Sequence, residues 1–88
     1  MIDENAVKQN LVEWLENPTW KHYYEGAPTE ALKAYIALDF YASETESEEA
    51  FDRLDGMLKK LNHEEVQYLY DRAIGPEKAK FAKILSNV

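Results

Sequence analysis

Residues 31–42 read Ala-Leu-Lys-Ala-Tyr-Ile-Ala-Leu-Asp-Phe-Tyr-Ala, and this stretch decides the fold. Ten of these twelve residues are Ala, Leu, Ile, Tyr or Phe. A helix with one solvent-facing side needs only about three or four apolar residues per two turns. A helix that is apolar nearly all the way round must lie at the centre of a helical bundle or be partly covered by a second chain.

The residues before this stretch predict one helix and one short turn. Residues 3–17 carry apolar side chains at the spacing of a helix face, with Asp3 as a suitable N-cap. Pro18 ends that helix, because the residue before a proline is disfavoured in the helical region. Residues 19–25 form a short helical turn. Pro28 is expected in the first turn of the apolar helix, where its missing N–H has no consequence.

The residues after this stretch predict further helices. The polar segment 43–47 is a break, and residues 50–61 then carry a regular apolar stripe. Asn-His-Glu-Glu at 62–65 has the pattern of a capping box. Residues 66–74 form the next apolar stripe. Gly75-Pro76 marks a stop and a restart, followed by a short C-terminal helix.

These patterns predict an all-α fold with no alternating strand pattern. We expect a small helical bundle of four main helices plus a short helical turn near residues 19–25. The length of 88 residues allows one core, so residues 1–88 form a single helical domain. Because the chain begins at Met1 and shows no tag or linker, we expect a complete small protein. The chain has no cysteine, which excludes disulfides and thiolate metal sites.

The N-terminus lacks the basic and long apolar regions of a secretory signal, and no apolar run is long enough for a membrane span. We therefore expect a cytoplasmic protein with no membrane partner. The net charge of −7 is unevenly distributed along the chain. Residues 1–56 hold thirteen acidic and four basic residues, whereas residues 57–88 hold four acidic and six basic residues. This asymmetry favours a charged partner or head-to-tail self-association.

Asp39 is the first candidate site residue. It lies three residues after Ile36 and four after Tyr35, among apolar positions of the helix rather than opposite them. Burying a carboxylate is unfavourable by several kcal/mol unless it is paired or hydrogen-bonded. The structural interpretation gives Asp39 a partner such as Arg53, His63, Lys78 or a tyrosine hydroxyl, so that Asp39→Ala lowers stability.

The functional interpretation makes Asp39 a general base or a ligand contact with a raised pKa. A catalytic carboxylate needs a second acid, a nucleophile or a metal nearby, and the sequence shows none at a recognisable spacing. We therefore name no catalytic residue and expect a non-enzymatic protein.

An acidic segment follows the apolar helix. Acids at a helix start interact favourably with the helix dipole, so the first interpretation is a solvated helix start. The alternative is a docking face for a basic protein. A shared helical face of acids could hold a hard cation only weakly, and the loop motif of an EF-hand is absent. The acidic residues of the segment are Glu44, Glu46, Glu48, Glu49, Asp52 and Asp55.

Three aromatic residues are candidate anchors for a partner, because binding hot spots are rich in Trp and Tyr. Trp20 belongs to an aromatic run around Pro18 that we mainly assign to the core. Tyr68 lies opposite the apolar stripe of its helix, and Tyr41 is also expected outside the core.

Other function classes lack their motifs. No phosphate-binding glycine loop, nucleophile elbow or His-Glu-x-x-His zinc motif is present, so we predict no cofactor and no metal. Three lysines after Gly75-Pro76 give only a weak footprint for nucleic acid. The sequence favours a protein-interaction module, an adaptor or inhibitor, that binds a basic protein through its acidic and aromatic surface. The alternatives are a homodimer or higher oligomer through helix 31–42, or a nucleic-acid-binding regulator using the last two helices.

Overall fold

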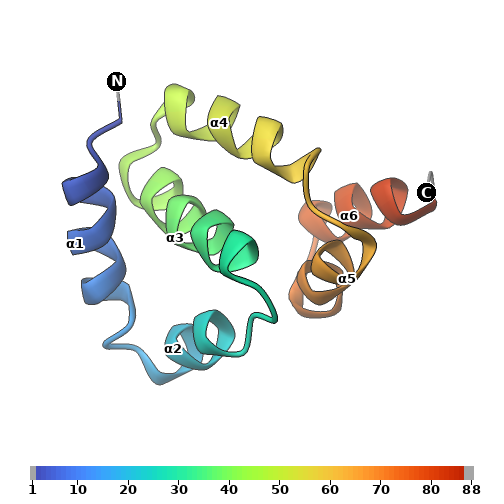
Figure 1. The fold of residues 1–88 in the computed structure, drawn as a ribbon, viewed down its shortest axis with the longest axis horizontal. Helices are drawn as coiled ribbons and strands as arrows, with labels where there is room; N and C mark the ends of the chain where they lie inside the picture. Colours follow the sequence, from blue (N-terminus) through green and yellow to red (C-terminus); the bar gives the residue numbers. More distant parts are fainter. Residues whose placement is uncertain (1, 87–88) are drawn as a thin grey trace.

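Six helices follow one another along residues 2–86, the part of the chain that this computed structural model describes (Figure 1). Within these residues there is no strand, so the all-α class is confirmed. The number of four main helices is not confirmed, because the turn expected near residues 19–25 is a complete helix and the last helix has eleven residues. The helices are α1 (Glu4–Trp14), α2 (Pro18–Glu25), α3 (Glu30–Thr45), α4 (Glu48–Leu58), α5 (His63–Arg72) and α6 (Pro76–Ser86).

Side-chain caps fix where five of these helices begin. Each cap accepts a hydrogen bond from a backbone N–H in the first turn, which replaces a bond that the helix cannot make itself. The expected N-cap at Asp3 is confirmed. The expected position of Pro28 is wrong, because Thr29 caps α3 and the proline lies one residue before it. The five capping residues are Asp3, Asn17, Thr29, Ser47 and Asn62.

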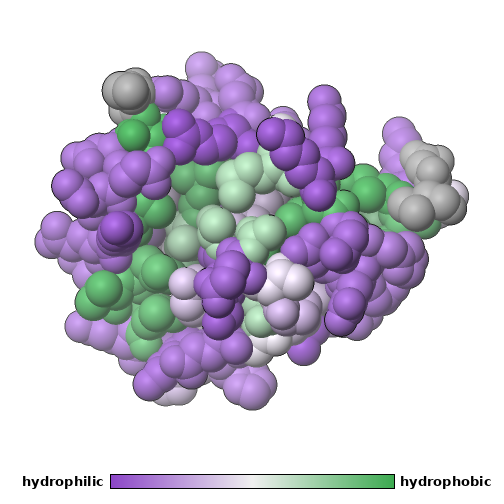
Figure 2. All heavy atoms as spheres, in the orientation of Figure 1, coloured by the Kyte–Doolittle hydropathy of each residue, from purple (hydrophilic) through white to green (hydrophobic). Residues whose placement is uncertain are grey.

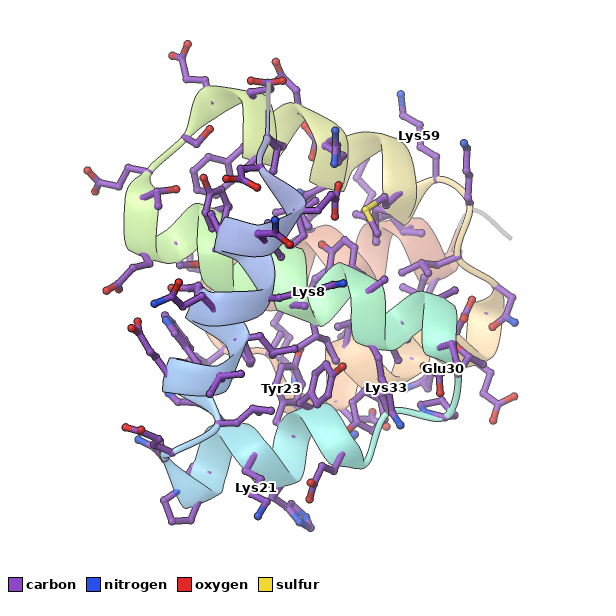
Figure 3. All side chains as sticks on the ribbon, turned by 60° about the vertical axis from the view of Figure 1, so that its left-hand side comes forward. Lys8, Lys21, Tyr23, Glu30, Lys33 and Lys59 are labelled. Atoms are coloured by element: carbon purple, nitrogen blue, oxygen red, sulfur yellow. The ribbon has the colours of Figure 1, made fainter. Side chains whose placement is uncertain are left out.

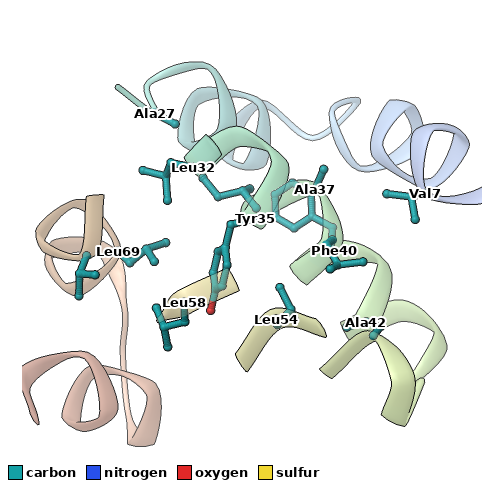
Figure 4. Packing of buried hydrophobic residues seen from close by; sticks show 14 of the residues in the cluster. Val7, Ala27, Leu32, Tyr35, Ala37, Phe40, Ala42, Leu54, Leu58 and Leu69 are labelled. Carbon is teal, nitrogen blue, oxygen red and sulfur yellow. The ribbon is translucent and has the colours of Figure 1, made fainter. Parts of the chain in front are cut away.

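Helix α3 lies at the centre of the fold, as its composition predicts. In Figure 1 it runs between α1 and α4, with α2 across one end. Figure 4 shows the ring of Tyr35 reaching from α3 toward Leu54 and Leu58 of α4. In Figure 2 apolar residues are visible over the middle of the molecule, interrupted by hydrophilic side chains, and most of the rim is hydrophilic. The buried residues of α3 are Leu32, Tyr35, Ile36, Ala37, Leu38, Phe40 and Ala42.

Helices α5 and α6 pack against each other at the other end of the molecule (Figure 1). Polar contacts connect them to helices α1–α4. The buried carboxylate of Glu65 accepts a hydrogen bond from the hydroxyl of Thr29 and another from the backbone N–H of Asn62, at 2.8 Å. This confirms the capping box of α5 and joins its first turn to the start of α3. On α6, Lys80 Nζ lies 3.3 Å from Asp55 Oδ1 of α4.

No helix within residues 2–86 is long and apolar enough to cross a membrane. The most apolar one, α3, has sixteen residues. At 1.5 Å per residue it is about 24 Å long, whereas the apolar part of a bilayer is about 30 Å thick.

Ile36→Ala tests whether α3 is the centre of the core. Ile36 is fully buried, so we expect the substitution to lower the free energy of unfolding by about 2 to 5 kcal/mol. The measurement is urea denaturation followed by circular dichroism. Ala34→Ser is the control at an exposed position of the same helix, where we expect a change within about 0.5 kcal/mol. Equal effects of the two substitutions would contradict the central position of α3.

Candidate binding groove around Asp39

A groove of about 490 Å³ separates the α2–α3 side of the molecule from α5 and α6. Its volume lies in the range of about 300 to 1,000 Å³ that is typical of ligand sites. Most of the lining is apolar or aromatic, with Asp39, Arg72 and Glu77 as its charged groups. The lining residues are Trp14, Thr19, Trp20, His22, Tyr23, Asp39, Phe40, Ser43, Leu69, Arg72, Ala73, Ile74, Glu77 and Phe81.

One wall of the groove is an aromatic cluster built by α1, α2 and α3. Trp14 stacks on Phe40, with ring centroids 4.5 Å apart and planes inclined by 15°. Trp20 lies over the edge of this pair, 5.4 Å from Trp14 and 5.6 Å from Phe40. The side chain of Trp20 keeps 39% of its surface exposed. The cluster therefore presents one indole ring, Trp20, toward solvent at the groove.

Tyr23 connects this wall to α5. Figure 3 shows Tyr23 pointing from α2 toward α3, and its ring centroid is 6.3 Å from that of Phe40. On the other side it stacks on Tyr68 of α5, with centroids 5.8 Å apart. The Tyr68 hydroxyl donates a hydrogen bond of 2.5 Å to the backbone oxygen of Tyr23. Arg72 covers the outer face of the Tyr68 ring at 3.6 Å.

Both tyrosines that the sequence placed outside the core are half-buried against it, so that expectation is wrong. Tyr68 lies opposite the apolar stripe of α5, as expected, but α2 covers that side. Gly26 at the end of α2 makes this contact close, since a Cβ there would lie 2.8 Å from the Tyr68 hydroxyl. Tyr41 is packed because α3 is covered on more than one side. Trp20 is the predicted aromatic anchor that remains exposed.

Asp39 has no polar partner among residues 2–86: its carboxylate makes no hydrogen bond and no ion pair in the structure. The expected partners are engaged elsewhere or do not reach it. Arg53 pairs with Glu4 at 3.0 Å, and Lys78 lies 4.7 Å over the ring of Tyr70. The expectation of a paired Asp39 is therefore wrong. Periodicity locates a residue on a helix face, but partners from other helices depend on packing that periodicity does not fix.

The surroundings of Asp39 raise the pKa of its carboxyl group. Burial, and after it the charge of Glu77, raise the pKa of Asp39 from 3.8 to about 6, against an opposing effect of Lys80. Burial, and after it the charge of Asp39, also raise the pKa of Tyr23 and Tyr35. Asp39 is thus a carboxylate that is costly to ionise in the folded chain, and it faces a groove. A perturbed acid in a groove is a candidate functional residue.

Ile74 stands at the mouth of the groove with 86% of its surface exposed. The sequence places it on the apolar stripe of residues 66–74, but α5 ends at Arg72 and the extended backbone of Ala73 carries Ile74 out of the helix. Gly75 then adopts a φ of +66°, a conformation that favours glycine. The chain turns there into α6, which brings Glu77 and Phe81 to the groove.

The groove also contains a serine and a histidine. Ser43, His22 and Asp39 all line it, yet no side-chain hydrogen bond joins any two of them within the described part of the chain. The groove thus provides an apolar and aromatic surface around Asp39, with Glu77 as a second acid in its lining.

The predicted acidic residues lie at the corner between α3 and α4 and along the start of α4. Those numbered 44, 46, 48, 49 and 52 are all exposed. Glu46 ends α3 in the left-handed conformation, with φ of 54°, and Glu48 and Glu49 lie in the first turn of α4. The described residues contain no group of three or more ligands that could hold a metal ion. This acidic corner begins one residue after Ser43, which lines the groove.

Two other predicted surfaces, helix 31–42 and the lysines of the last helix, make contacts within the chain. Seven residues of α3 are buried among the other helices. On α6, Lys80 is paired with Asp55, and Lys78 lies over Tyr70. These contacts give two of the three lysines intramolecular partners.

No family model, curated protein or solved structure matches the chain. The candidate site therefore rests on its geometry. Sequence reasoning identified Asp39 and Trp20 but missed Ile74, Phe81 and Glu77 as their neighbours. The sequence offered one indication that Ile74 is exposed, because it is an apolar residue directly before Gly75, where a helix is expected to end.

Asp39→Asn tests how much the unpaired carboxylate of Asp39 lowers the free energy of unfolding. Since the pKa of Asp39 is raised on folding, the folded chain binds more protons than the unfolded chain between about pH 4 and pH 6. The contribution of Asp39 to stability is therefore lost as the pH rises through this window. We expect Asp39→Asn to raise the free energy of unfolding at pH 7 by about 1 to 3 kcal/mol, and to change it little at pH 4.

The measurement is urea denaturation of both chains at the two pH values. This expectation reverses the sequence-based one for Asp39→Ala, because an acid without a partner has no favourable contact to lose. A lower stability of Asp39→Asn at pH 7 would show that the carboxylate has a partner after all.

Proposed function

We propose that this chain is a non-enzymatic protein-interaction module, an adaptor or inhibitor, which binds a basic segment of a partner protein in the groove around Asp39. The observation that carries the proposal is the exposure of Ile74 and Trp20 beside Asp39, a half-buried carboxylate that has no hydrogen-bond or ion-pair partner within residues 2–86. An apolar surface around such a carboxylate is complementary to a ligand with both apolar and cationic groups.

The apolar part of the groove supports binding by burial. Ile74 and Trp20 project from different sides of the groove, so one bound segment can cover both. Burial of apolar surface contributes about 25 cal/mol per Å² removed from water. Tryptophan is also among the residues most enriched in binding hot spots. These side chains would supply most of the affinity.

The acidic corner supports a role in association. Glu44, Glu46 and Glu48 are exposed and follow Ser43, a lining residue of the groove, in the chain, and the whole chain has a net charge of −7. Charged surfaces of one sign attract partners of the opposite sign and mainly raise the association rate. A basic segment would first be attracted to this corner and then settle into the groove.

Ile74→Ser and Val12→Ser form a matched test of the groove. Both residues are exposed, by 86% and 65%, and only Ile74 lines the groove. Peptides are selected on the immobilised chain from a random library, and the affinity of the strongest binder is measured by calorimetry. We expect basic sequences whose affinity falls roughly 5- to 20-fold with Ile74→Ser and stays unchanged with Val12→Ser. Selected peptides without basic residues, or equal effects of the two variants, would refute the proposal.

The steering role is tested by neutralising the acidic corner. The triple variant Glu44→Gln, Glu46→Gln and Glu48→Gln should slow association of the selected peptide about 3- to 10-fold at low salt. The difference should vanish at about 0.5 M salt, where the charges are screened. Stopped-flow fluorescence of Trp20 and Trp14 measures the rates. Association rates that do not depend on salt would remove this part of the mechanism.

A further inference from the structure

Building on the proposed function, we infer that the groove seats the guanidinium group of an arginine side chain from the partner. Asp39 and Glu77 are its carboxylate partners, and the exposed ring of Trp20 is its aromatic neighbour.

The charges of the groove point to a cation. Asp39 on α3 and Glu77 on α6 both line the groove, and they are near enough for the charge of Glu77 to oppose the ionisation of Asp39. The basic groups nearby are engaged in other contacts. Lys80 pairs with Asp55 at 3.3 Å, and Arg72 lies over the ring of Tyr68. Two acids therefore line one groove, and the described structure shows no hydrogen bond or ion pair from either of them to Lys80 or Arg72.

The shape and chemistry of the groove favour a guanidinium over an ammonium. A guanidinium is planar, is less strongly hydrated than an ammonium, stacks on aromatic faces and has five donors that can serve two carboxylates. A lysine ammonium is a compact, strongly hydrated charge and loses more on entering an apolar groove. Trp20 offers a partly exposed indole ring, and Asp39 and Glu77 offer acceptors from two different helices.

The rim of the same groove already contains an example of this contact. The guanidinium of Arg72 lies 3.6 Å from the centroid of the Tyr68 ring, and its Nη1 donates a hydrogen bond of 3.2 Å to the backbone oxygen of Tyr68. An incoming arginine would repeat this arrangement on the opposite wall, with Trp20 in place of Tyr68. Its aliphatic stem would lie against Ile74, as long charged side chains do on apolar surfaces.

The test uses three blocked tripeptides that differ only in the central side chain: Gly-Arg-Gly, Gly-Lys-Gly and Gly-citrulline-Gly. Citrulline has nearly the shape of arginine and no charge. Each is titrated into the isotopically labelled chain at pH 7, and the indole N–H signals of Trp14 and Trp20 are followed by NMR. For the arginine peptide we expect a dissociation constant on the order of 1 to 10 mM. The lysine peptide should bind at least about 3-fold more weakly, and the citrulline peptide should cause no saturable shift.

Two variants with the same loss of charge give the control. Asp39→Asn lies in the groove, whereas Glu13→Gln lies at an exposed position of α1, outside both the groove and the acidic corner. We expect Asp39→Asn to weaken the arginine peptide about 10-fold or more, and Glu13→Gln to leave its affinity unchanged. Both variants keep the aromatic wall, so a loss confined to Asp39→Asn reports the carboxylate alone.

The affinity of the arginine peptide at acid pH is an independent test, because only the ionised Asp39 attracts the guanidinium. With a pKa of about 6, the ionised, binding-competent fraction of Asp39 falls about 10-fold between pH 7 and pH 5. The arginine peptide should weaken by roughly that factor, and the residual pH dependence of Asp39→Asn reports every other group. The titratable or charged groups that face Asp39 or line its groove are His22, Tyr23, Tyr35, Arg72, Glu77 and Lys80.

Equal binding of the arginine and citrulline peptides, equal binding of the lysine peptide, or full binding by Asp39→Asn would each overturn the arginine assignment. None of these results affects the comparison of Ile74→Ser with Val12→Ser on library peptides. Failure of the arginine seat is therefore distinguishable from failure of the proposed function.

Discussion

The structure depends on one constraint: α3 has to be shielded from water on nearly all of its sides. Its seven buried residues include Leu32 and Ile36, which are completely inaccessible, and Phe40 at 2%. Two helices pack along its length and a third crosses one end. Short, individually capped helices suit this task, because each can approach α3 from its own direction. The remaining side of α3 faces α5 and α6, and the groove lies between these helices.

Asp39 marks the place where this constraint is not met. A carboxylate among the apolar positions of the central helix opposes the packing that stabilises the rest of the chain. Sequences usually avoid such conflicts between local chemistry and fold, except at functional or strained sites. Here the conflict coincides with a groove, an exposed indole and an exposed isoleucine. The coincidence is physically informative because a cationic ligand would pair with the half-buried carboxylate and cover the apolar surface together.

The sequence was most informative about local structure. The caps at Asp3 and Asn62 follow from interactions within a few residues, and both were predicted, whereas α5 ends at Arg72, two residues before the predicted end. The central position of α3 was predicted because a helix with apolar side chains on every face must be covered by other helices on nearly every face. Tyr68 was misplaced, since whether the second face of α5 is covered depends on α2, more than forty residues away. The groove itself could not be predicted, because it exists only where α5 and α6 meet α2 and α3.

The central claim is that Asp39 is an unpaired carboxylate in an incompletely closed groove. Its most direct test is the carboxyl-carbon chemical shift of Asp39, followed by NMR as a function of pH in the free protein. The structure predicts a titration with a pKa of about 6, shifted upward chiefly by burial. A pKa at or below 3.8 would mean that the carboxylate is solvated or paired, and would contradict the account of the groove.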